Sequence, residues 1–175
     1  MEFPIGTDSI SFAESFLKPY RTCHLVGLNA EASDLGRSIL DEELVEICRG
    51  IRDHDNKLRI LLFATPDRRE HMRSLIDQTK LDNVILEDHT KSIFDVAALV
   101  SFLNVMISPN TSFVHIASAF NIPTVAIFQN DAKDISFWSP RSSQYRIIKP
   151  LDASSTIRGF STAETTSAAI ELLAD

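Results

Sequence analysis

The side chains best suited to bind an anion stand in residues 108–117, as Thr111, Ser112 and His115. This stretch follows an apolar run and opens a segment with helical periodicity, so free backbone N–H groups at a helix N-terminus are expected there. His115 comes three and four positions after the two hydroxyls, which places all three on one helix face. The spacing indicates a phosphate or diphosphate site. The alternative is that Thr111 only caps the helix and His115 is structural.

Two other polar loops follow apolar runs and could add contacts to such a site. The loop 29–40 carries one cation, Arg37, which could hold a phosphate through two hydrogen bonds or simply lie on the surface. After the second apolar run, Thr65 fits the N-cap of a helix, with proline at its first position. Residues 129–143 are expected to form a long strand-free loop, in which Trp138 could stack on a ligand or anchor packing.

Several chemistries lack their sequence motif. The five glycines form neither G-x-G-x-x-G nor G-x-x-x-x-G-K-[ST], which removes the main support for a nicotinamide-dependent dehydrogenase or a P-loop protein. There is also no G-x-S-x-G and no H-E-x-x-H motif. The two cysteines, Cys23 and Cys48, have no zinc-binding spacing and are expected to be reduced core residues.

Apolar runs and helical patterns alternate along the chain, and these elements must position the candidate residues. The expected strands cover residues 24–29, 58–64, 84–86, 105–107, 123–128 and 145–148. The expected helices cover residues 10–17, 41–54, 65–77, 92–102, 111–120 and 162–173. Strands that are apolar throughout predict a parallel sheet covered on both faces. The predicted fold class is therefore α/β, a single doubly wound Rossmann-like domain with a mainly parallel sheet, which binds ligands at the carboxyl ends of its strands.

Composition supports one domain and argues against several partners. The chain has 175 residues, 44% of them hydrophobic and 23% charged, as is ordinary for a globular domain. A net charge of −7 without a basic cluster argues against nucleic acid. No apolar run approaches the roughly 20 residues of a transmembrane helix, and the N-terminus lacks the basic start of a signal peptide. We therefore expect a cytoplasmic protein.

Residues 110–128 resemble the signature of glycosyltransferase family 9, which includes the ADP-heptose:lipopolysaccharide heptosyltransferases. Ser92 with residues 95–99 is similar to the family's S-L-x-[ED]-x-A-x-[LI] helix, and residues 28–30 followed by Arg37 are similar to its first strand and basic loop residue. Together with the family's late W-x-P, matched by residues 138–140, the resemblance covers about residues 24–150.

The resemblance implies a GT-B architecture, in which two Rossmann-like domains enclose the active site. This chain is similar to the C-terminal, nucleotide-sugar-binding domain alone, with residues 23–175 as that domain and residues 1–22 as a linker. The N-terminal domain, which would bind the glycolipid acceptor and supply the catalytic base, has no counterpart here. We therefore expect the chain to be inactive alone, and its sequence leaves the catalytic residues unknown.

The implied activity is inverting glycosyl transfer from a nucleotide sugar, with ADP-heptose as the default donor. The product would be lipopolysaccharide or lipooligosaccharide core, or a related surface glycan. The reaction would need neither a metal ion nor another cofactor. The full enzyme would act in the cytoplasm, with peripheral association at the cytoplasmic face of the inner membrane as one option.

By resemblance, the donor-binding residues lie in the loops at one edge of the sheet. Arg37 stands where the family has a Lys or Arg on the donor phosphates, and the donor-binding turn begins at Asn110. The full predicted donor-binding set is Asn29, Arg37, Thr65, Ser92, Asn110, Thr111, Ser112 and His115. Asn110 replaces the family's usual Asp and Ser112 its commoner Gly, which leaves the identity of the donor open.

Two rival functions stay open from the sequence. One is a non-catalytic remnant or split partner that keeps the fold and docks another protein, which fits the Asn110 substitution and the missing half. The other is a different Rossmann-like nucleotide binder, such as half of a sugar-nucleotide epimerase. That function would need a pair of catalytic carboxylates in the cleft.

Overall fold

A six-stranded parallel sheet organises the chain in the computed structural model, which describes residues 4–153 and 155–174. The strands follow the order β3-β2-β1-β4-β5-β6, and every neighbouring pair is parallel. Their bounds are β1 Leu25–Asn29, β2 Arg59–Phe63, β3 Val84–Glu87, β4 Val105–Pro109, β5 Thr124–Ile127 and β6 Tyr145–Ile148. The prediction of a doubly wound α/β sheet is confirmed.

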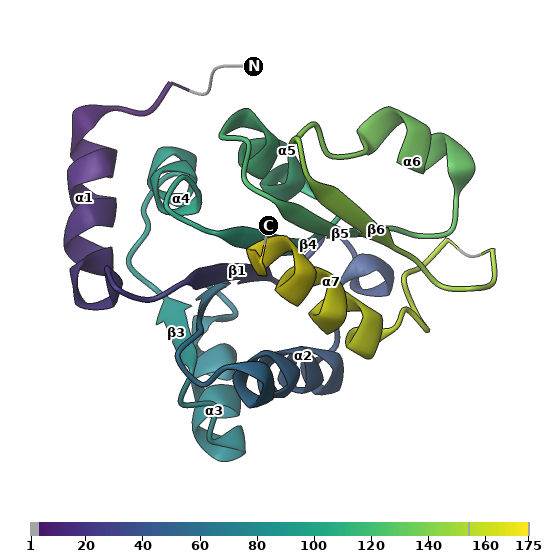
Figure 1. Cartoon of the computed structure of the whole chain (residues 1–175), viewed down its shortest axis with the longest axis horizontal. Coiled ribbons are helices and arrows are strands. Elements are labelled where there is room, and N and C mark those ends of the chain that lie inside the picture. The colour runs from purple at the N-terminus through teal and green to yellow at the C-terminus, as the bar shows by residue number, and fades with distance from the viewer. Residues whose placement is uncertain (1–3, 154, 175) are drawn as a thin grey trace.

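Helices cover both faces of the sheet, as Figure 1 shows. One face carries α2 (Asp41–His54), α3 (Arg69–Thr79) and α7 (Thr162–Ala174). The other carries α1 (Thr7–Leu17), α4 (Ile93–Val100), α5 (Ser112–Ala119) and α6 (Ala132–Trp138). Two short 3₁₀ turns, η1 (Lys18–Tyr20) and η2 (Leu35–Arg37), complete the described elements. Among the described residues, no helix combines the length and the apolar character that crossing a membrane requires.

The central strands form from apolar runs because both of their faces are buried. All five residues of β1 are buried, and Val26 pairs with Ile60 of β2 on one side and with Val105 of β4 on the other. The sheet separates a larger core cluster beneath α2 and α7 from a second cluster beneath α1, α4 and α5, and a small third cluster lies between α5 and α6. The sheet is thus held rigidly from both sides, which fixes the loops at its carboxyl edge.

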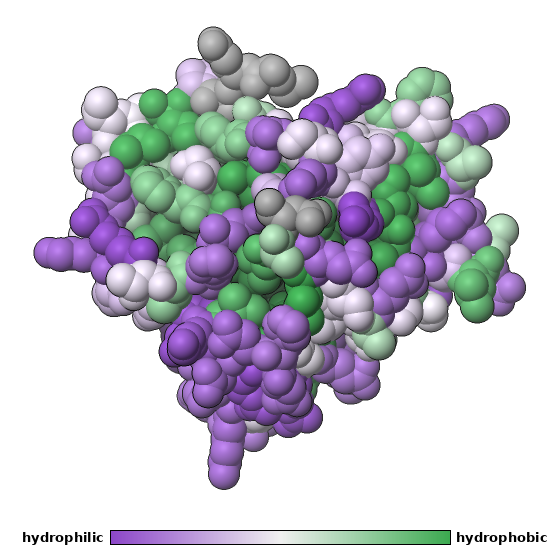
Figure 2. Space-filling model, in the orientation of Figure 1, coloured by the Kyte–Doolittle hydropathy of each residue, from purple (hydrophilic) through white to green (hydrophobic). Residues whose placement is uncertain are grey.

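The N-terminal segment, predicted to be part of a linker, contributes α1 to the second core cluster. Ala13 and Leu17 are buried, and the Ser9 hydroxyl donates to the Asp95 carboxylate of α4 at 2.7 Å. In Figure 2, apolar residues gather between α1 and α4, whereas α3 is covered by hydrophilic residues. This segment is therefore packed onto the domain, and its role in joining another domain stays a prediction.

Two local predictions were wrong. The helix expected from Thr65 begins at Arg69, because the Thr65 hydroxyl bonds the Asp67 carboxylate and the Thr65 carbonyl accepts the Arg68 N–H in a turn. The stretch 129–143 is strand-free as expected but contains helix α6, which Asp131 caps through the N–H groups of residues 133 and 134. Helix α6 has only seven residues and buries none of them completely, so it is too short to show a clear helical period of apolar residues.

Candidate functional site

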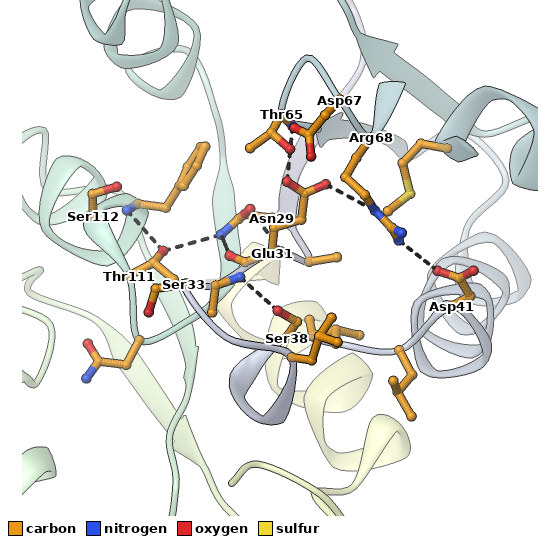
Figure 3. A pocket seen from close by; sticks show the side chains of 18 of the residues that line it. Asn29, Glu31, Ser33, Ser38, Asp41, Thr65, Asp67, Arg68, Thr111 and Ser112 are labelled. Atoms are coloured by element: carbon orange, nitrogen blue, oxygen red, sulfur yellow. Dashed lines mark hydrogen bonds and ion pairs between the residues drawn. The ribbon is translucent and has the colours of Figure 1, made fainter. Parts of the chain in front are cut away.

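A cleft of about 960 Å³ lies where β1, β2 and β4 end at the carboxyl edge of the sheet. The strand order reverses between β1 and β4, and open α/β sheets bind their ligands outside such a point. Four segments build most of the walls, namely the loop after β1, the start of α2, the loop after β2 and the start of α5, and Met72 of α3 adds to them. Figure 3 shows their polar side chains turned toward one another across this cleft.

Asn29, the last residue of β1, ties two of these walls together. Its side chain is almost completely buried, and its Nδ2 donates to the Glu31 carbonyl at 2.9 Å, the Ser108 hydroxyl at 3.1 Å and the Thr111 hydroxyl at 3.3 Å. Its Oδ1 accepts the Glu31 N–H at 3.2 Å. A polar side chain of this kind is retained in a core only when its hydrogen bonds are satisfied. Asn29 therefore fixes the β1 loop against the start of α5.

The start of α5 forms the wall that is best suited to an anion. Thr111 is the N-cap, its hydroxyl accepts the Phe113 N–H at 3.3 Å, and Ser112 is exposed at the first helical position. Phe113 packs on Phe63 with ring centroids 4.9 Å apart, which holds this end of the helix on the sheet. Asn110 also lines the cleft, and its Nδ2 donates to Asp134 of α6 at 3.1 Å. Helix N-termini of this kind attract negative charge.

The opposite wall is acidic and contains one arginine. Glu31, Asp41 and Asp67 line it, together with Arg68. The Arg68 guanidinium lies 3.4 Å from Asp41 and 3.9 Å from Glu31, so it bridges the loop after β1 and the start of α2, as the dashed lines in Figure 3 show. The hydrogen bond from Thr65 lowers the pKa of Asp67 below its usual value, which keeps this carboxyl ionised at the cleft.

A second, smaller pocket of about 310 Å³ adjoins the cleft through Asn29, Glu31, Thr65 and Phe113. Its walls are mainly apolar and come from β2, the loop after β3 and the first turn of α4; they include Phe63, Ala64, Pro66, Ile93 and Val96. Ser92, the N-cap of α4, stands at its rim. The buried Glu87 shapes the loop by accepting hydrogen bonds from the N–H groups of His89 and Thr90.

The structure brings together five of the eight predicted donor-binding residues and leaves three outside the main cleft. Asn29, Thr65, Asn110, Thr111 and Ser112 line it, whereas Ser92 lines the neighbouring apolar pocket. Arg37 bonds Asp34 at 2.5 Å and Ser33 at 2.8 Å, outside the cleft. His115 packs edge-on against Trp138 of α6, with ring centroids 5.6 Å apart, instead of joining the two hydroxyls.

Five charged residues that line the cleft are absent from the predicted donor-binding set: Glu31, Asp41, Glu42, Asp67 and Arg68. Each stands in a loop or at a helix start at the carboxyl edge of the sheet, and this position was the signal that could have revealed them. Among the described residues, no group of three His, Cys, Asp or Glu side chains is arranged to hold a metal ion.

Residues 46–160 match the sequence model of glycosyltransferase family 9 (heptosyltransferase), which is more than half of the chain. The chain belongs to glycosyltransferase family 9. A Haemophilus influenzae protein whose name assigns it to the glycosyltransferases is 30% identical over 93 residues, which are 53% of this chain and 24% of that protein.

Solved structures of the family share this fold. A family 9 glycosyltransferase from Veillonella parvula superposes with a TM-score of 0.81 at 16% identity, over 99% of this chain and 54% of that one. ADP-heptose LPS heptosyltransferase II of E. coli gives a TM-score of 0.79 at 13% identity, over 99% and 53%. The E. coli heptosyltransferase WaaC with ADP gives 0.69 at 14% identity, over 93% and 49%. This chain thus spans about half the length of these family 9 proteins.

Proposed function

We propose that this domain binds the nucleotide-sugar donor of an inverting glycosyltransferase. The observation that carries the proposal is the cleft at the strand-order reversal, with the exposed start of α5 in its wall. A family 9 chain with such a cleft has both the fold and the anion-attracting end that a nucleoside diphosphate needs. Because one similar structure holds ADP and another holds ADP-2-deoxy-2-fluoro heptose, ADP-heptose is the first donor to test.

The diphosphate would lie against the start of α5. The N–H groups of the first turn and the Thr111 and Ser112 hydroxyls are the available donors there. The partial positive charge of the helix end would stabilise the negative charge that develops on the leaving nucleoside diphosphate. In this proposal the protein groups carry the charge and no metal ion is required.

The nucleobase would occupy the apolar pocket beside the cleft. A pocket of about 310 Å³ with Phe63 and Ile93 in its walls offers flat apolar contact, and Ser92 and Thr90 offer hydrogen bonds at the rim. Asn29 and Thr65 stand where the two cavities meet, within reach of sugar hydroxyls between base and diphosphate. Arg37 and His115 remain in the proposal as residues of the outer rim, which would have to leave their present partners to contact the donor.

Transfer itself would need a second domain that holds a glycolipid acceptor and the catalytic base. The chain spans 54% of the similar Veillonella protein and 53% of heptosyltransferase II, so about half of each has no equivalent in this domain. We place the complete enzyme in the synthesis of lipopolysaccharide or a related surface glycan, at the cytoplasmic face of the inner membrane. The isolated chain should therefore bind donor without transferring sugar, and measurable turnover by the chain alone would contradict this half-enzyme proposal.

Calorimetric titration with ADP, UDP, GDP and ADP-heptose tests the binding proposal. We expect one nucleotide to bind in preference to the others, and Ser112→Trp to abolish binding because the indole would fill the cleft mouth at an exposed position. Ser11→Trp is the matched control, since Ser11 is exposed on α1 away from the cleft. If the folded wild-type chain binds none of the four, the donor-binding proposal fails and the non-catalytic alternative is favoured.

A further inference from the structure

Arg68 is the only cationic side chain among the described residues that line the cleft. The same walls contain four carboxylates, those of Glu31, Asp41, Glu42 and Asp67. Apart from Arg68, every charged side chain that an anionic ligand meets in this space is therefore negative. The proposed function requires a diphosphate in this cleft, so a cation must offset that repulsion.

The neighbouring arginines Arg37, Arg158 and Arg69 form hydrogen bonds or ion pairs outside the main cleft. Arg37 donates to Asp34 and Ser33. Arg158 donates to Glu43 and to the carbonyls of residues 35 and 38, which braces the loop after β1 from behind. Arg69 donates to Thr90 and lies 3.8 Å from the buried Glu87. Each of these guanidinium groups has a structural partner, and none of them lines the main cleft.

Arg68 is held more loosely than Arg37. Its guanidinium is 3.4 Å from Asp41 and 3.9 Å from Glu31, compared with 2.5 Å between Arg37 and Asp34. The side chain is 40% exposed, so it can turn into the cleft without leaving a packed core. Glu31 makes no hydrogen bond to Arg68: one carboxylate oxygen accepts the Thr65 N–H at 3.1 Å, and the other, buried without a hydrogen-bond partner, has only the 3.9 Å ion pair with the guanidinium.

We propose that Arg68 binds the diphosphate of the nucleotide sugar, exchanging its two carboxylate neighbours for phosphate oxygens. The inference rests on the proposed function and adds a binding residue to it. A guanidinium forms two parallel hydrogen bonds with a phosphate, which are stronger than its present long contacts. Arg68 and the start of α5 would then hold the diphosphate from opposite walls of the cleft, with Asp41 left to His71, already 2.6 Å away.

Titration of the full chain with ADP and with inorganic pyrophosphate tests the inference. Pyrophosphate probes the anion site alone, and ADP probes it together with the base pocket. We expect Arg68→Gln to weaken the binding of both by about 10- to 100-fold, the usual effect of losing hydrogen bonds to a charged group. Arg73→Gln is the matched control: it removes the same charge from α3, the helix that begins directly after Arg68, but Arg73 pairs with Asp88 outside the cleft and should leave both affinities within about twofold.

A second variant separates binding from a purely structural role. Asp41→Asn removes a carboxylate that repels phosphate and competes for Arg68, so we expect it to tighten pyrophosphate binding by about threefold or more. If Arg68 only braced α2 and α3, the same variant would leave the affinity unchanged or lower it. Arg37→Gln is the third variant to titrate. If Arg37→Gln loses affinity for both probes and Arg68→Gln retains it, the inference is wrong while the proposed function stands. Failure of the wild type to bind pyrophosphate or any of the four nucleotides of the first titration overturns both.

Discussion

Thr111 performs two tasks with one hydroxyl, since it caps α5 and faces the cleft. We predict that Thr111→Ala lowers the free energy of unfolding by about 1 kcal/mol, as is typical when an N-cap is lost, and also weakens nucleotide binding. Thr111→Ser keeps the oxygen and should restore both properties almost fully. Urea denaturation and calorimetry on the three proteins check this. A Thr111→Ala protein with full affinity would mean that the hydroxyl serves the helix alone.

Asp95 gives the fold a defined response to acid. Its carboxylate accepts the Ser9 hydroxyl at 2.7 Å and the N–H groups of Lys91 and Ser92, and these bonds, with Ser9 the largest cause, lower the pKa of Asp95 below its usual value. The unfolded chain therefore binds this proton more tightly than the native one. The carboxylate accordingly stabilises the fold above its unfolded pKa of about 4, and this stabilisation is lost as the pH falls through the lowered value.

We therefore predict that Asp95→Asn is less stable than the wild type near neutral pH and loses less stability between about pH 5 and pH 3. Ser9→Ala should change the pH dependence in the same direction by a smaller amount, because the two backbone donors remain. Urea midpoints measured across this range check the prediction. Identical pH profiles for the wild type and Asp95→Asn would contradict it.

At the residue scale, the sequence predicted cleft residues that directly follow a strand. It did not predict contacts between residues that are far apart in the chain. Asn29 and Thr111 were predicted because each follows an apolar run. The hydrogen bond between them joins positions 82 apart, and the Arg68–Asp41 pair joins positions 27 apart, so no local spacing could reveal either. His115 was expected in the site because it follows Thr111 and Ser112 at helical spacing and matches the family motif, but in the structure its ring packs against Trp138 on the unpredicted α6.

At the scale of elements, α1 is part of the core. Leu17 is 4% exposed in the cluster beneath α4, so we predict that Leu17→Ala lowers the free energy of unfolding by about 2–4 kcal/mol. Glu14→Ala on the exposed side of the same helix should change it by less than about 0.5 kcal/mol. Chemical denaturation of both variants is the measurement. Equal, small effects would show that this segment behaves as a linker only.

Strands and long helices could be predicted because their burial determines where apolar residues stand in the sequence. A strand buried on both faces is apolar throughout, and a helix buried along one stripe has apolar residues at helical spacing. The run Arg59–Phe63 is one example, and the spacing of Leu44, Ile47, Cys48 and Ile51 in α2 is another. The first turn of α3 was misplaced because a hydroxyl that fits an N-cap can also bond a carboxylate two residues later, as Thr65 does with Asp67. Which of these two hydrogen bonds the hydroxyl forms depends on the folded structure and cannot be predicted from the local sequence.

At the scale of the whole molecule, Cys48 reports on global opening. It is fully buried in α2 beneath the sheet, and burial raises the pKa of its thiol to about 12, whereas Cys23 is partly exposed. We predict that a disulfide reagent at pH 8 modifies Cys23 in the native protein and reaches Cys48 only at the rate of unfolding. The Cys23→Ser protein should then show no fast-reacting thiol. A fast second thiol would contradict the packing of α2.

The register of the sheet also sets the order in which the protein can be made. Val26 meets Val105 across the central pair β1 and β4, so one edge of β1 stays unpaired until the chain beyond residue 105 has been synthesised. Parallel pairings between such distant segments form slowly, because the entropy lost in closing a long loop is offset only after the strands have made contact. The cleft borders both of these strands. The chain can therefore bind a ligand only late in its synthesis. A chain that stalls before β4 exposes the unpaired apolar edge of β1 to other protein chains.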